Sequence, residues 1–167
     1  MAKKILLHGG EIFCIPLFMP KDDWQLKIKL SEKDLDNDFA FGRVIETSSN
    51  VLVEIFNKIG SAKIDINDIV NSGVMFSPLL IFWDGVAKKR WKIIGSTDNY
   101  DKFNHSNYGN LKMVFPDPDD NFRLRDFTSG IETKISRKEV EDKKYEGSCV
   151  WWPIDLENRI IEKMNGK

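Results

Sequence analysis

The stretch FAFGRVIETSSNVLVEIFN, residues 39–57, decides how the rest of the chain must be arranged. Its two halves are rich in aromatic and β-branched residues, and the polar segment 47–50 separates them. Residues of the first kind favour strands, whereas a short Thr/Ser/Asn segment can bond to its own backbone in a turn. We therefore predict a β-hairpin with strands at 39–46 and 51–57.

Counting outward from this turn gives the register of the hairpin, with Glu46 facing Val51. The remaining cross-strand pairs are Ile45 with Leu52, Arg43 with Glu54 and Phe41 with Phe56 on one face, and Val44 with Val53 and Gly42 with Ile55 on the other. Both faces are largely apolar, so we expect the hairpin to lie inside the sheet with other elements packed on each side. Arg43 and Glu54 should form a salt bridge, a structural pair that contributes about 0.2–1 kcal/mol over an alanine pair.

Length and charge limit the class of protein. A chain of 167 residues favours one domain, residues 1–167, with a core large enough to be stable without staples. Charged residues make up 31% of the chain but leave a formal net charge of −1, which argues against bulk attraction to nucleic acid or to an anionic membrane. The apolar run at 5–7 is too short for a signal peptide, and the stretch 74–83 is about half a membrane span. We therefore expect a cytoplasmic protein with no membrane partner.

Outside the hairpin, the pattern predicts short strands separated by polar turns. These strands are expected at 11–17, 75–83, 90–95, 111–115, 122–127, 131–135 and 149–152, with a turn at 84–85 and a long surface loop at 96–110. Helices are expected near 64–70, after a capping box at Ser136, and from a cap at Asp155 along the apolar stripe of Leu156, Ile160, Ile161 and Met164. The sum is an α+β, mostly β fold: a strongly curved antiparallel sheet or partial barrel with two or three short helices, including a C-terminal helix.

The residues that most often carry chemistry do not form a recognisable motif. His8 and His105 are not spaced with other metal ligands, so both are interpreted as surface residues. Cys14 and Cys149 lie in apolar runs, which favours buried free thiols over a disulfide. The acidic run 117–121 lacks the Gly and Glu that an EF-hand loop requires, and it is typical of a surface turn. We expect no enzyme, no metal and no cofactor.

Acidic residues gather at two places. They are Glu32, Asp34, Asp36 and Asp38 in the first, and Asp117, Asp119 and Asp120 in the second. The segment 31–40 carries four carboxylates and one lysine, a net charge of −3. An acidic face would speed the capture of a basic protein and set its orientation more than it would add affinity. A solubilising loop is an equally good interpretation.

Basic and aromatic residues interleave elsewhere and support a rival hypothesis. The basic ones are Lys88, Lys89, Arg90, Lys92, Arg123 and Arg125. Such charges beside exposed rings are typical of surfaces that bind single-stranded nucleic acid, so the alternative is a small nucleic-acid-binding β-barrel. A half-buried strand around Trp91 explains the same pattern, and nucleic acid is therefore the less favoured partner.

Several segments together resemble immunity protein family 26 of bacterial polymorphic toxin systems. They are GEIFCIPL (10–17), FAFGRVI (39–45), VLVEIF (51–56), RWKIIG (90–95) and the closing RI at 159–160. Their order and spacing carry the resemblance, which spans roughly residues 9–161. The chain departs from the family pattern by an insertion at about 18–38.

The resemblance implies a mostly β protein, used in contact-dependent competition, that neutralises a cognate toxin and has no catalytic residues. We therefore predict stoichiometric inhibition by a preformed protein–protein interface of about 1,600 Å2. A nuclease is one candidate toxin, because an acidic face could occupy its basic substrate cleft. The candidate toxin-binding residues are Glu32, Asp34, Asp36, Asp38, Asp117, Asp119 and Asp120.

Overall fold

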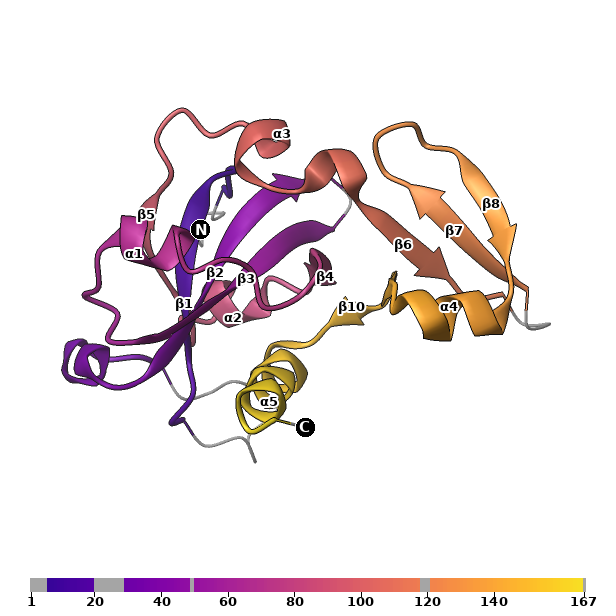
Figure 1. Cartoon of the computed structure of the whole chain (residues 1–167). Coiled ribbons are helices and arrows are strands. Elements are labelled where there is room, and N and C mark those ends of the chain that lie inside the picture. Colours follow the sequence, from indigo (N-terminus) through magenta and orange to yellow (C-terminus); the bar gives the residue numbers. More distant parts are fainter. Residues whose placement is uncertain (1–5, 20–28, 49, 118–120, 167) are drawn as a thin grey trace.

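The hairpin predicted at residues 39–57 is the centre of the fold. The computed structural model describes residues 6–19, 29–48, 50–117 and 121–166. Strands β2 (Phe39–Thr47) and β3 (Val51–Gly60) pair antiparallel and are the two middle strands of a six-stranded sheet (Figure 1). Seven of the nine residues of β2 and five of the ten residues of β3 are buried, because other elements pack on both faces of the sheet.

The register of the hairpin is as predicted at its middle and different at both ends. Arg43 pairs with Glu54, flanked by the predicted pairs Gly42–Ile55 and Val44–Val53. Two irregularities then shift the ladder. At the turn, Glu46 pairs with Leu52 and Thr47 with Val51, so Ile45 is an extra residue; at the other end, Ala40 pairs with Ile59. The predicted pairs Glu46–Val51, Ile45–Leu52 and Phe41–Phe56 are therefore wrong, since each bulge adds unpaired residues to one strand.

Four further strands complete the first sheet. They are β1 (Glu11–Pro16), β4 (Leu79–Ile81), β5 (Lys92–Ser96) and β10 (Val150–Trp151), in the order β10-β4-β3-β2-β1-β5. Neighbouring strands are antiparallel except β10, which pairs parallel with β4. The C-terminal part of the chain thus returns to the first sheet, where β10 forms the edge strand next to β4.

Helices cover the two faces of this sheet. On one face, Val44 and Ile55 of the hairpin pack in one cluster with Leu156 and Ile160 of α5 (Pro153–Met164). The same cluster includes α2 (Asp84–Ala87). On the other face, Phe41 and Phe56 pack with residues of the short helix α1 (Ile66–Val70) and of the 3-10 helix η1 (Glu32–Asp36). Figure 1 shows α5 below the sheet and α1 at its left side.

A second, four-stranded sheet stands beside the first (orange, right side of Figure 1). Its strands are β6 (Lys112–Phe115), β7 (Phe122–Asp126), β8 (Glu132–Ile135) and β9 (Glu146–Gly147), in the order β8-β7-β6-β9. Helix α4 (Arg137–Lys143) lies between β8 and β9 in the sequence. The chain enters it through α3 (Lys102–His105) and the 3-10 helix η2 (Tyr108–Asn110). Ile45 and Leu52 of the hairpin pack against Tyr108, Leu111 and Met113, which joins the two sheets through one apolar cluster.

The predicted class, α+β and mostly β, is confirmed, and several details differ. In the described residues the ten strands form two open sheets rather than a barrel, and there are five α-helices instead of two or three. The strand expected at 75–83 forms a regular strand only at 79–81, after Pro78, which has no N–H to donate to the ladder. The turn expected at 84–85 is part of α2, and the loop expected at 96–110 contains α3 and η2.

The predictions for the two cysteines and for the start of the C-terminal helix are confirmed only in part. Cys14 is a buried free thiol as predicted, and burial raises its pKa to about 11. Cys149 is free but exposed, so its placement in the core is wrong. It lies in the link between β9 and β10, where the chain crosses from one sheet to the other. Helix α5 begins at Pro153 rather than after Asp155, because proline is favoured in the first turn of a helix.

Candidate functional site

The predicted pair Arg43–Glu54 forms a buried salt bridge in the centre of the first sheet. Arg43 Nε donates to Glu54 Oε1 at 2.8 Å, and Nη2 lies 2.7 Å from the same oxygen. The two side chains are 1% and 3% exposed. A charge buried to this degree must be paired and hydrogen-bonded, because the interior cannot replace its hydration shell.

The segment around α3 supplies the remaining partners of this pair. Arg43 Nη1 donates to Thr97 Oγ1 at 3.1 Å, and Nη2 donates to the backbone carbonyl of His105. Ser106 Oγ donates to Glu54 Oε1 at 2.5 Å and lies 2.8 Å from the hydroxyl of Tyr100. No local pattern predicts these partners, since they lie more than 40 residues from both Arg43 and Glu54 in a polar segment.

Two aromatic rings enclose the guanidinium of Arg43. Its Cζ lies 5.3 Å from the ring centroid of Phe56 and 5.1 Å from that of Tyr100, within range of a cation–π interaction. Burial raises the pKa of Tyr100 above its ordinary value, so this phenol stays protonated. A hollow of about 530 Å3 opens beside the pair, but all three guanidinium nitrogens already donate within the protein. The network therefore holds the α3 segment against the hairpin.

A second buried pair lies on the opposite face of the sheet and was missed by the sequence prediction. Arg90 binds Glu157 of α5 in a bidentate arrangement, with Nε–Oε1 and Nη2–Oε2 distances of 2.8 Å. Trp91 Nε1 also donates to Glu157 Oε1 at 2.8 Å. Arg90 and Glu157 are both 0% exposed. The sequence does contain a signal for this pair, because Glu157 lies within the apolar stripe of α5, where a carboxylate needs a buried partner.

The first predicted acidic group lies on and beside η1. Glu32 pairs with Lys92 at 2.9 Å and Asp36 with Lys63 at 2.6 Å, so two of its charges are partly compensated. Asp34 accepts from the backbone and the hydroxyl of Ser31, which caps the turn and lowers the pKa of its carboxyl. Asp38 is exposed. The predicted insertion, about 18–38, includes residues 20–28, which lie outside the described part of the chain.

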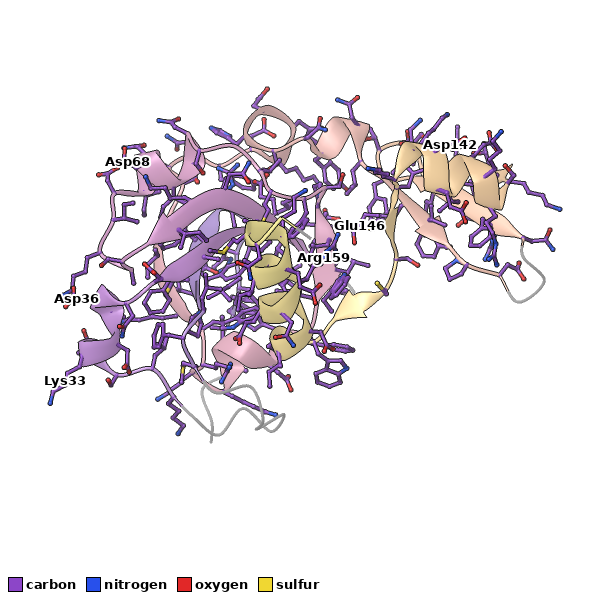
Figure 2. The ribbon with its side chains drawn as sticks, turned by 60° about the horizontal axis from the view of Figure 1, so that its bottom comes forward. Lys33, Asp36, Asp68, Asp142, Glu146 and Arg159 are labelled. Carbon is purple, nitrogen blue, oxygen red and sulfur yellow. The ribbon has the colours of Figure 1, made fainter. Side chains whose placement is uncertain are left out.

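One residue of the second predicted acidic group, Asp117, lies in the described part of the chain. Asp117 follows β6, whereas Asp119 and Asp120 lie outside the described residues. Figure 2 shows Lys33 and Asp36 at the left, far from the second sheet and its labelled Asp142 at the right. Asp117 therefore belongs to the part of the chain that carries the second sheet and not to the η1 turn, and the role of both predicted groups in binding stays a prediction.

The basic residues of the rival hypothesis are dispersed. Arg90 is buried against Glu157, which makes it unable to touch nucleic acid. Lys88 pairs with Asp84 at 3.2 Å, Lys92 with Glu32, and Arg123 with Glu132 at 3.0 Å. Arg123 and Arg125 belong to β7 of the second sheet, whereas Lys92 begins β5 of the first sheet and Lys88 and Lys89 follow α2. These residues do not form the continuous basic groove that a single-strand binder uses.

An exposed aromatic surface, also unforeseen, lies where the strands β4 and β10 end. Phe82 and Trp152 stack with their ring centroids 4.3 Å apart, and they are 38% and 52% exposed. Beside them a hollow of about 600 Å3 is lined by residues of β10 and α5, including Trp151, Asp155, Arg159 and Glu162. The sequence predicted a strand at 149–152, but β10 pairs over two residues only, and Trp152 follows it at the surface.

Other classes of site receive no support from the described residues. His8 and His105 are exposed, as predicted, and no group of three or more His, Cys, Asp or Glu is placed to hold a metal ion in this part of the chain. Within the same residues, every helix is too short or too polar to cross a bilayer.

Comparisons with known proteins place this architecture in a family. A stretch of 109 aligned residues is 26% identical to the Arabidopsis thaliana protein described as "IQ domain-containing protein IQM5", covering 52% of this chain and 22% of that protein. The chain thus spans about a fifth of the length of this relative. No solved structure matches it. The sequence model of Imm26, described as "Immunity protein 26", matches residues 8–114, which include β1 to β5 and most of β6. The chain therefore belongs to the immunity protein 26 family.

Proposed function

We propose that this protein binds a cognate toxin domain of a bacterial polymorphic toxin system and neutralises it by stoichiometric protein–protein inhibition. Membership of the immunity protein 26 family is the observation that carries the proposal. The family match covers the central hairpin with both residues of the pair Arg43–Glu54, so β1 to β5 are the shared part of the first sheet.

The construction of the first sheet is consistent with a preformed interface. Each face carries a buried Arg–Glu pair, and each pair ties the sheet to a segment distant in sequence: α3 through Arg43–Glu54 and α5 through Arg90–Glu157. A rigid scaffold loses less conformational entropy on binding, which favours high affinity at a given interface area. Rapid and tight capture is what a cell needs against its own toxin.

The acidic turn around η1 is the proposed docking surface for a basic toxin such as a nuclease. Its charge can steer association, whereas its ion pairs with Lys63 and Lys92 limit its contribution to affinity. Asp34 is best left unchanged in a test, because it caps the turn at Ser31. Asp36 and Asp38 can be altered without removing that cap.

Reversing these two charges, in Asp36→Lys with Asp38→Lys, is expected to slow association with the toxin domain about tenfold at low salt and much less at high salt. Surface plasmon resonance at two ionic strengths measures this effect. The matched control is Glu141→Lys with Asp142→Lys on α4, two exposed positions with the same change in net charge. Equal slowing by both variants, or none by the first, would remove the η1 turn from the interface.

Co-expression with the toxin domain encoded beside the gene tests the function itself. Growth should be rescued, and the two proteins should co-purify. Failure of both, together with salt-dependent retention of the protein on an oligonucleotide column, would favour the nucleic-acid hypothesis instead.

A further inference from the structure

The stacked pair Phe82–Trp152 is held in place although it faces solvent. Phe82 follows β4 and Trp152 follows β10, and the parallel pairing of these strands brings the two rings together. The backbone N–H of Phe82 donates to the carbonyl of Trp151 at 3.0 Å, which fixes the two strand ends. Exposed and preorganised tryptophan is the residue type that most often dominates the energy of protein interfaces.

The charges next to this pair are acidic. Asp155 and Glu162 are exposed residues of α5, and both line the hollow beside Trp152. Neither is in an ion pair with another described residue. Arg159 is the cation in the same hollow, but it is already neutralised by Glu146. The rim of the hollow therefore keeps two uncompensated negative charges.

Arg159 shows which ligand fits a site of this composition. Its guanidinium binds Glu146 in a bidentate arrangement, with distances of 2.7 and 2.9 Å (Figure 2). Its Cζ lies 4.3 Å from the ring centroid of Phe76 and 4.7 Å from that of Trp151. An arginine that stacks on rings while it binds a carboxylate is thus accommodated inside this surface. Trp152 with Asp155 and Glu162 repeats the same combination of ring and carboxylates without an arginine of the chain.

We propose that Phe82, Trp152, Asp155 and Glu162 form a docking surface for a basic segment of the toxin domain, with an arginine or lysine of that segment stacked on Trp152. The inference rests on the proposed function and names the contact it would use. Stacking on a tryptophan and pairing with carboxylates suits arginine best, because its planar guanidinium does both at once. Trp152, Asp155 and Glu162 lie beyond residue 114, outside the part of the chain that matches the family, whereas Phe82 lies within it, so the three outer residues would serve the choice of one toxin over another.

The test measures the affinity of the full chain for the toxin domain by calorimetry. Trp152→Ala should weaken binding by about 30-fold or more, the effect of losing a central aromatic anchor. Asp155→Asn with Glu162→Gln should also weaken binding and reduce its salt dependence. The matched controls are Phe103→Ala, at an aromatic residue that is 55% exposed on α3, and Glu141→Gln with Asp142→Asn on α4. Both controls should stay within twofold of the wild type, and thermal unfolding verifies that each variant is folded.

The outcomes are separable. Wild-type affinity in Trp152→Ala, with the wild type binding normally, would overturn this surface and leave the proposed function intact. A wild type that fails to bind the toxin at all would overturn both. A dimer in gel filtration that Trp152→Ala converts to a monomer, without loss of toxin binding, would make a second copy of the chain the occupant and would overturn the proposal.

Discussion

Glu157→Ala is expected to destabilise the protein by about 3–5 kcal/mol, because it leaves Arg90 buried without its carboxylate. The carboxylate of Glu157 accepts three hydrogen bonds, two from Arg90 and one from Trp91 Nε1. Its loss therefore leaves a cation and an indole N–H without these acceptors, and it weakens the packing of α5 on the sheet. The free energy of unfolding from urea titrations measures the effect.

The control for this prediction lies one turn further along the same helix. Glu162→Ala removes an exposed carboxylate and should change stability by less than about 0.5 kcal/mol. The double variant Arg90→Met with Glu157→Leu removes both charges and should be more stable than Glu157→Ala, since no charge is left stranded. If Glu157→Ala lowers the free energy of unfolding no more than Glu162→Ala does, the pair Arg90–Glu157 does not hold α5 on the sheet.

Glu54→Ala is expected to lower the free energy of unfolding by a similar amount, about 3–5 kcal/mol, and to loosen the contact between the hairpin and the α3 segment. Glu54 accepts from both Arg43 and Ser106, so it links the hairpin to the segment that carries α3. Hydrogen exchange of backbone amides should therefore accelerate at 97–108, whereas amides of α5 should keep their protection. Urea unfolding and hydrogen exchange with mass spectrometry measure the two effects.

Glu46→Ala offers a matched control on the same hairpin. Glu46 also binds the α3 segment, through Lys102 at 2.6 Å, but the two side chains are 24% and 30% exposed. A pair that is this accessible to solvent is worth about 1 kcal/mol or less. If the two substitutions cost the same, burial would not be what makes the Arg43–Glu54 pair important.

The sequence predicted the middle of the hairpin well because a short turn and a period of two define which residues face each other. That logic paired Arg43 with Glu54 correctly. It failed beyond Val44 and before Gly42, because a bulge is an extra residue without a local signature. A sequence pattern reports on a single strand or helix, so the errors in the predicted register begin where the strand departs from its regular period of two.

The parts of the site that the sequence did not predict all depend on distant partners. Glu157 is tolerated at an apolar position of α5 because its carboxylate binds the guanidinium of Arg90, which lies 67 residues earlier in the sequence. Acidic residues near η1 were predicted from composition, but Lys63 and Lys92, which reduce their charge, come from other segments. The pattern predicts Trp152 as the last residue of a strand at 149–152, whereas β10 ends at Trp151 and leaves Trp152 exposed beside Phe82.

Titration of purified toxin with the purified protein tests the central claim, inhibition by binding, most directly. Toxin activity should fall linearly as the protein is added and reach zero at one equivalent, with fresh toxin staying active once the protein is consumed. Loss of activity at a small fraction of an equivalent, continuing with each new addition of toxin, would mean that the protein acts catalytically and would contradict the account.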